Sequence, residues 1–220
     1  MSKVVNAGVM FRVRASSLPI FLFSVVAVAS LFLAPVALEA QPSVEGEWGA
    51  VHPLPWRPVH SVLLPTGRVL VYANTDQQHW DPITETLDDT ADHGYNAFCG
   101  GHTQLADGRS FFAGGHIPGC TGLKNAAYYD PLSDTYTLLP EMAGGRWYPS
   151  LVTLSNGDVV TMSGRLEDGS KNLIPEVWEI GNHAWRPLSG ASLNLPLFPA
   201  AFLAPNGQVF VATNPSRYLD

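Results

Sequence analysis

The sequence predicts an all-β protein, because its 220 residues combine many turn-forming residues with a repeated pattern of short apolar strands. Gly (20) and Pro (18) are plentiful while charged residues make up only 14%, which favours short strands and tight turns over long helices. The pattern of an apolar stretch, a polar turn and a β-rich run occurs four times. A repeat with two hairpins in each copy is typical of a β-propeller.

Each copy opens with a β-hairpin whose turn contains glycine. The four turn glycines are Gly67, Gly108, Gly157 and Gly207. Each follows Thr, Asp or Asn, and such pairs supply the positive φ that tight hairpin turns require. The turns recur every 41 to 50 residues, so we expect blades that start near residues 60, 102, 150 and 200.

A second hairpin follows in each copy, marked by an aromatic residue and then an acidic or turn residue. The copies read Trp80-Asp81, Tyr129-Asp130, Trp178-Glu179 and Tyr218-Leu219-Asp220. This element resembles the outer hairpin of kelch repeats, and Ala113-Gly114-Gly115 resembles the glycine pair that ends the second kelch strand. Residues 41–220 are therefore predicted to form a kelch-type β-propeller without helices, in which the polar segment 182–199 connects two blades.

The number of repeats is smaller than a closed propeller needs. About three to four blades of an expected seven are present, and the pattern stops within the fourth at Asp220. We therefore expect the chain to be the N-terminal portion of a longer protein, inactive by itself and dependent on further C-terminal blades as partners.

The N-terminal region differs from the rest and resembles a signal peptide. Three basic residues precede an apolar run at residues 20–33, which is short for a membrane span. Residues 1–40 are predicted to be removed after Ala40, with an uncleaved anchor as the alternative. The mature chain is then extracellular or periplasmic and not attached to a membrane.

Charge and cysteine content narrow the possible partners. The net charge of −7 offers no basic surface for phosphates, which argues against nucleic acid. Two cysteines, Cys99 and Cys120, could form a disulfide in an oxidising compartment. The seven histidines show no spacing typical of a metal motif.

Two stretches that open blades carry unusual residues, 96–102 and 145–150. The first strands of propeller blades line the central channel, so Cys99 and Tyr148 are predicted to meet near the axis from adjacent blades. Simpler interpretations remain open. Tyr148 and Trp147 could be core aromatics, and Arg146 could orient a substrate or pair with an acid.

Phe98-Cys99 before one blade and Arg146-Trp147-Tyr148 before the next resemble the galactose oxidase and glyoxal oxidase group of copper radical oxidases. Other sequence stretches also resemble this family, so that the resemblance covers about residues 48–220. It implies that Tyr148 is an equatorial copper ligand and radical site, and that a thioether joins Cys99 to its ring. It also implies oxidation of small aldehydes or primary alcohols by O₂, with H₂O₂ as product.

The sequence also departs from this family. The axial tyrosine and two histidines that complete the family's copper site have no counterparts in these residues. The indole that stacks over the crosslink in galactose oxidase has no match either, because residues 162–166 stand in its place. That departure favours a glyoxal-oxidase-like protein. The alternative is a non-catalytic kelch propeller that binds a protein or a glycan.

Overall fold

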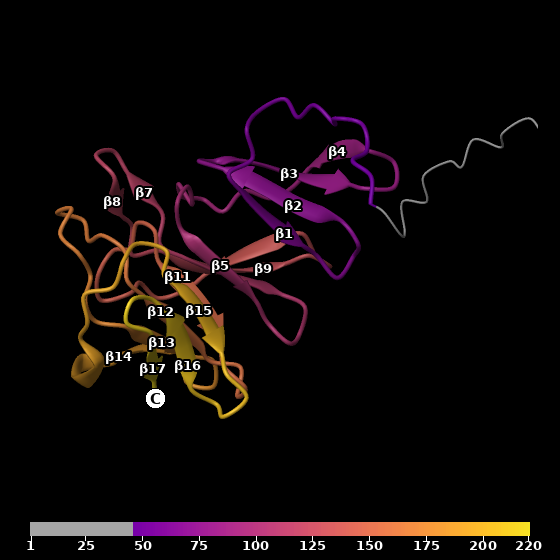
Figure 1. Cartoon of the computed structure of the whole chain (residues 1–220). Coiled ribbons are helices and arrows are strands. Elements are labelled where there is room, and N and C mark those ends of the chain that lie inside the picture. The colour runs from indigo at the N-terminus through magenta and orange to yellow at the C-terminus, as the bar shows by residue number, and fades with distance from the viewer. Residues whose placement is uncertain (1–45) are drawn as a thin grey trace, which may run out of the picture. The chain divides into compact units, whose positions relative to one another are not determined.

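The computed structural model of the protein describes residues 46–220 (Figure 1). The predicted signal peptide at residues 1–40 lies outside this range. The chain separates into two units, Met1–Val51 and His52–Asp220, and every strand described below belongs to the second unit. No helix within residues 46–220 is long and apolar enough to cross a membrane.

Four antiparallel sheets, here called blades 1 to 4, follow one another along the chain. Blade 1 contains β1 (His60–Leu63), β2 (Val69–Ala73), β3 (Asp76–Asp81) and β4 (Thr86–Asp89). Blade 2 contains β5 (Gly101–Gln104), β6 (Ser110–Ala113), β9 (Ala126–Asp130) and β10 (Thr135–Leu138). A separate hairpin of β7 (His116–Ile117) and β8 (Thr121–Gly122) interrupts blade 2 between β6 and β9.

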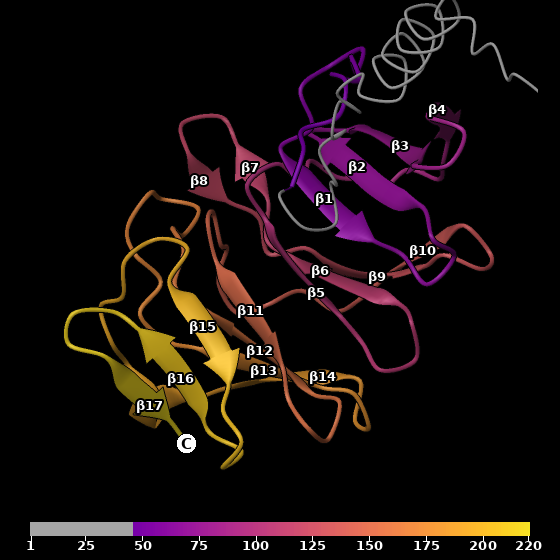
Figure 2. The ribbon, with the colours of Figure 1, turned by 45° about the vertical axis from the view of Figure 1, so that its right-hand side comes forward.

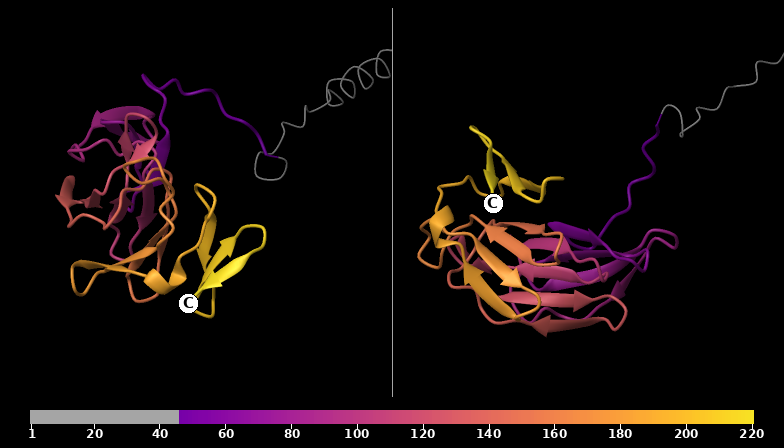
Figure 3. Two further views of the ribbon diagram at one scale, coloured as in Figure 1. Left: turned by 90° about the vertical axis from the view of Figure 1, so that its left-hand side faces the viewer. Right: turned by 90° about the horizontal axis from the view of Figure 1, so that it is seen from below.

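Blades 3 and 4 repeat the same meander. Blade 3 contains β11 (Ser150–Thr153), β12 (Val159–Met162), β13 (Glu176–Glu179) and β14 (Ala184–Pro187). Blade 4 contains β15 (Ala200–Leu203), β16 (Val209–Ala212) and β17 (Arg217–Leu219). The strand β11 contacts both β5 and β15, so the first strands of successive blades lie side by side (Figure 2). Figure 3 shows the sheets following one another from purple to yellow. The all-β, propeller-type fold class is confirmed.

The hairpin turns form as their residue types predict. The four turn glycines have φ values between 83° and 91°, a region that disfavours side chains with a Cβ atom. In the outer hairpins, the acidic residue after the aromatic makes the turn: Asp81 Oδ1 accepts from the backbone N–H of Ile83, and Asp130 Oδ1 accepts from that of Leu132. In blade 2 the aromatic–acidic pair thus combines a residue of the core, Tyr129, with a turn residue, Asp130.

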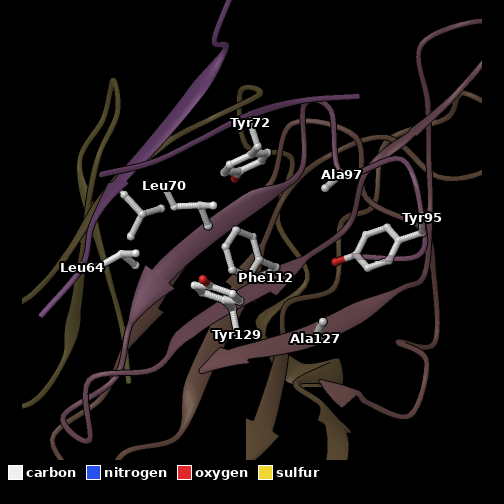
Figure 4. Close-up of a cluster of buried hydrophobic side chains, with 9 residues drawn as sticks. Leu64, Leu70, Tyr72, Tyr95, Ala97, Phe112, Ala127 and Tyr129 are labelled. Carbon is white, nitrogen blue, oxygen red and sulfur yellow. The ribbon is translucent and has the colours of Figure 1, made fainter. Parts of the chain in front are cut away.

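The hydrophobic core consists of three clusters between successive blades. Adjacent residues on a strand point to opposite faces, so Phe112 packs toward blade 1 while Phe111 packs toward blade 3. The same alternation separates Val159 from Val160 in β12. Figure 4 shows the first cluster, in which the rings of Tyr72, Phe112 and Tyr129 gather between blades 1 and 2. The second strand of each complete blade is therefore covered on both faces.

The segment predicted as a plain connection, residues 182–199, contains regular structure. Its first part forms β14, the outer strand of blade 3, in which Trp185 pairs with Trp178 of β13. Its middle part forms a short 3-10 helix, Ser189–Ala191. The second hairpin predicted for each copy therefore forms in blade 3, and only the start of the connection at residue 182 was predicted wrongly. Exposed outer strands are polar and resemble loops in sequence; all four positions of β14 are exposed or intermediate.

Candidate active site

Cys99 and Tyr148 occupy equivalent positions in the repeat, two residues before the first strand of blades 2 and 3. Phe198 holds the same position before blade 4. All three, which we call the lead residues, have left-handed backbone conformations, with φ of 57°, 65° and 46°. Residues with a Cβ atom adopt this conformation rarely, so the surrounding structure must hold it.

Backbone hydrogen bonds link the lead residues in series. The N–H of Tyr148 donates to the carbonyl of Cys99 at 2.8 Å, and the N–H of Phe198 donates to the carbonyl of Tyr148 at 3.0 Å. The N–H of Cys99 donates to Nε2 of His60 at 3.1 Å. These bonds fix the lead residues of three blades relative to one another.

The side chains of Cys99 and Tyr148 meet, as the sequence predicted for adjacent blades. The interaction of the phenol with the Cys99 thiol is the main cause that raises the pKa of Tyr148. Cys99 is 1% exposed, and burial raises the pKa of its thiol. The raised pKa values favour the protonated thiol and the protonated phenol at neutral pH.

Two aromatic rings stack on the ring of Tyr148. Trp147 lies at 3.7 Å between ring centroids with an interplanar angle of 11°, and Phe198 lies at 4.4 Å with an angle of 24°. Two nearly parallel rings at such short separations would overlap if they shared one face, so Trp147 and Phe198 lie on opposite faces of Tyr148. The phenol is held between two apolar surfaces while its hydroxyl contacts Cys99.

The sequence did not assign these stacking roles. It treated Trp147 only as a core aromatic and found no indole partner, whereas the structure places Trp147 directly on Tyr148. Arg165, from the segment that stands in the expected indole's place, lies over the Trp147 ring at 5.4 Å. Phe198 was missed altogether, although Phe-Pro before blade 4 repeats Tyr-Pro before blade 3 and could have indicated it.

Arg146 pairs with an acid, which decides between its two predicted roles. Its guanidinium is fully buried and donates to Glu176 Oε1 at 2.7 Å and to the carbonyls of Ser163 and Ile174. The other carboxylate oxygen of Glu176 accepts from the N–H of Ala143. Arg146 therefore anchors the segment that carries Tyr148 and does not face a substrate.

The predicted glycine pair is required because two backbones approach it closely. A Cβ atom on Gly114 would lie 2.3 Å from the carbonyl oxygen of Arg146, and one on Gly115 would lie 2.3 Å from that of Asn96. The end of β6 thus packs against both site-forming segments. No other residue type fits there without moving the site.

A cavity of about 210 Å³ lies beside the lead residues. The first strands of all four blades contribute to its wall, with His60 from β1, His102 from β5, Ser150 from β11 and Ala201 from β15. This is the position expected for the channel of a propeller. Burial and the neighbouring His102 and His93 lower the pKa of His60 to about 4, so its ring is neutral near pH 7.

Cys120 and the remaining histidines form no site of their own. Within residues 46–220 both Cys99 and Cys120 are free, and Cys120 is exposed, so the structure shows no disulfide between them. Across the same residues, no group of three or more His, Cys, Asp or Glu side chains could hold a metal ion. Copper(II) favours several nitrogen and oxygen ligands. Tyr148 by itself would therefore not complete a copper site.

The fold and the site together define a class of protein: a propeller-type all-β chain in which lead residues of adjacent blades bring a cysteine to a stacked tyrosine. No family model matches the sequence. Two galactose oxidase sequences of Gibberella zeae are each 29% identical to it over 182 residues, covering 76% of this chain and 25% of each relative. Art an 7 of Artemisia annua, provisionally assigned as an aldehyde oxidase, is 27% identical over 130 residues, covering 54% of this chain and 22% of that protein.

A solved structure agrees with the fold. A fungal alcohol oxidase of the AA5 family, determined in complex with copper, superimposes with a TM-score of 0.60 at 22% sequence identity and covers 76% of this chain and 39% of its own. The chain is homologous to galactose oxidase, and the resemblance to the copper radical oxidase family is confirmed. It spans about a quarter of the length of the galactose oxidases that it matches.

Proposed function

We propose that this chain forms the part of a secreted, kelch-type copper radical oxidase that carries its redox-active cysteine and tyrosine. In this role Tyr148 is a copper ligand and the radical site, and a thioether joins Cys99 to its ring. The observation that carries the proposal is the juxtaposition of the buried Cys99 with Tyr148; their segments before adjacent blades are joined by the hydrogen bond from the Tyr148 N–H to the Cys99 carbonyl. The homology to galactose oxidase supports it.

The proposed reaction is the oxidation of small primary alcohols or aldehydes. An alcohol, or an aldehyde in its hydrated form, loses two electrons and two protons, and O₂ accepts them to become H₂O₂. The names of the relatives, a galactose oxidase and a provisional aldehyde oxidase, support this substrate class. The predicted signal peptide at residues 1–40 supports an extracellular location.

The residues around Tyr148 suit a persistent oxidised phenol. Trp147 and Phe198 cover both faces of the ring, which limits the access of other reactants to those faces. Bound copper would supply a one-electron acceptor and a positive charge that favours the ionised phenol. The proposal requires that further nitrogen or oxygen ligands join Tyr148.

Peptide mapping of the complete gene product, produced with copper in air, tests the proposal. We expect one proteolytic product that joins the peptides of Cys99 and Tyr148 and has lost two hydrogen atoms. The linkage should survive reduction, unlike a disulfide. Copper-dependent H₂O₂ production with small alcohols or aldehydes is the second readout.

Two variants provide the controls. Cys99→Ser should abolish the linked peptide, while Cys120→Ser should leave it intact because Cys120 is exposed and outside the lead residues. Separate, unmodified peptides of Cys99 and Tyr148 in the wild-type protein would contradict the proposal. That result, with no peroxide formed, would favour a non-catalytic propeller.

A further inference from the structure

The backbone N–H groups of the three lead residues do not all donate to the same kind of acceptor. Phe198 donates to a carbonyl, that of Tyr148, and Tyr148 donates to a carbonyl, that of Cys99. Cys99 instead donates its N–H to a side chain, Nε2 of His60. The imidazole of blade 1 thus takes the place that a backbone carbonyl has at the next two blades.

We infer that His60 is a positioning residue for Cys99, which holds the sulfur against Tyr148 so that the thioether can form. This inference rests on the proposed function. Cys99 has a left-handed backbone with φ of 57°, and its side chain is 1% exposed. An N–H in such a place needs a partner, and the acceptor on His60 keeps this strained conformation in place.

The ring of His60 is itself held on two sides. It stacks on Tyr72 at 4.7 Å with an interplanar angle of 14°, and it meets His102 edge to face at 5.8 Å. The hydroxyl of Tyr72 is hydrogen-bonded to Nδ1 of His102 at 2.9 Å, which links these two supports. Tyr72 is fully buried and packs against Phe112 in the first core cluster (Figure 4). The position of Cys99 is therefore tied to the core between blades 1 and 2.

The protonation of His60 suits this role. Nε2 accepts a hydrogen bond, so the proton of the neutral ring lies on Nδ1. Burial disfavours the imidazolium, which would replace the acceptor by a donor. His60 acts on the Cys99 backbone and does not contact the reacting atoms, so it is not a catalytic residue in this scheme.

The step that His60 assists is an oxidative coupling. A bond forms between the Cys99 sulfur and a carbon of the Tyr148 ring, while the S–H bond and one ring C–H bond break. The two electrons and two protons go to O₂, which becomes H₂O₂. Coupling requires the sulfur to stay beside the ring, and a small displacement slows such a reaction strongly.

The rate of coupling tests the inference. The complete gene product is prepared without copper and then exposed to Cu(II) and O₂, and the linked peptide is quantified over time. We expect His60→Ala to slow coupling on the order of tenfold or more. His60→Gln, whose amide oxygen can accept the Cys99 N–H, should recover most of the rate, and His183→Ala, at an exposed position, should leave it unchanged.

The same set of variants distinguishes a role of His60 in positioning Cys99 from a general effect on folding. Thermal unfolding of each variant shows whether it is folded; a purely structural role would lower stability without slowing coupling in the folded protein. If His60→Ala does not fold, Tyr72→Phe keeps the stacked ring but removes the hydrogen bond to His102, and it should slow coupling several-fold. Coupling at the wild-type rate in His60→Ala, or equal slowing by Gln and Ala, would overturn the inference. A wild-type protein that never couples would instead contradict the proposed function.

Discussion

Two regions of the molecule bury polar side chains, and they do so differently. Between blades 1 and 2 the buried groups are neutral histidines and tyrosines. His93 is 1% exposed, and neither of its ring nitrogens has a hydrogen-bond partner among the described residues; the hydroxyl of Tyr95 is also unpaired. Before blade 3 the buried groups are the ions Arg146 and Glu176, which share a hydrogen bond of 2.7 Å and have further backbone partners.

The difference follows from the cost of removing each group from water. A neutral imidazole or phenol can be buried in an aromatic environment at moderate cost, and burial keeps it neutral by shifting its pKa. An ion can be buried only with an opposite charge and hydrogen bonds around it. The histidines between blades 1 and 2 should therefore make the stability of the protein depend on pH. Before blade 3, stability should fall when one partner of the ion pair is removed.

The largest effect is expected when the ion pair is broken. Arg146→Met leaves the carboxylate of Glu176, which is 2% exposed, without its counter-ion, and should lower the free energy of unfolding by about 3–5 kcal/mol. Denaturant titration measures this change. The matched control is Arg186→Ala at the exposed pair with Glu179, which should cost less than about 1 kcal/mol. Equal effects of the two variants would show that burial does not distinguish these pairs.

The next effect is a dependence of stability on pH. The pKa values of His60 and His93 are lowered to about 4, below the value of 6.5 that each has when unfolded. Between these values the unfolded chain binds more protons, so stability falls as pH decreases from 6.5 to about 4. Each histidine contributes a slope of at most about 1.4 kcal/mol per pH unit. His93→Phe should reduce the slope, and an unchanged slope in this variant would refute this account.

The smallest effects concern single hydroxyls between blades 1 and 2. Tyr129 is hydrogen-bonded to His79 Nε2 at 2.5 Å and to Asp134 at 2.9 Å, so Tyr129→Phe should cost about 1–3 kcal/mol of unfolding free energy. Tyr95→Phe removes a buried hydroxyl that has no partner, and it should leave stability unchanged or raise it by up to about 1 kcal/mol. Thermal or denaturant unfolding of both variants compares a paired with an unpaired hydroxyl. A larger loss in Tyr95→Phe than in Tyr129→Phe would reverse the interpretation.

Much of the fold could be predicted because its signals are local. A turn glycine with positive φ and a run of alternating apolar residues are contained in a few adjacent positions, and all four hairpins formed as expected. The connection after blade 3 was predicted to start too early, at residue 182, because the exposed residues of β14 carry no such alternation. In the site, the position of Cys99 and Tyr148 before successive blades followed from the repeat and the family resemblance.

The strands and the turns follow from the sequence alone, since each depends on residue types repeated at a fixed period. The proximity of Cys99 and Tyr148 was predicted from their places in that repeat together with the family resemblance. Only the tertiary structure decided what surrounds that pair. The acceptor on His60 lies 39 positions from Cys99, and Glu176 lies 30 positions from Arg146. Such contacts depend on how neighbouring blades pack, and no periodic pattern records them. The stacking of Phe198 on Tyr148 is of the same kind, since it forms only when blade 4 folds against blade 3.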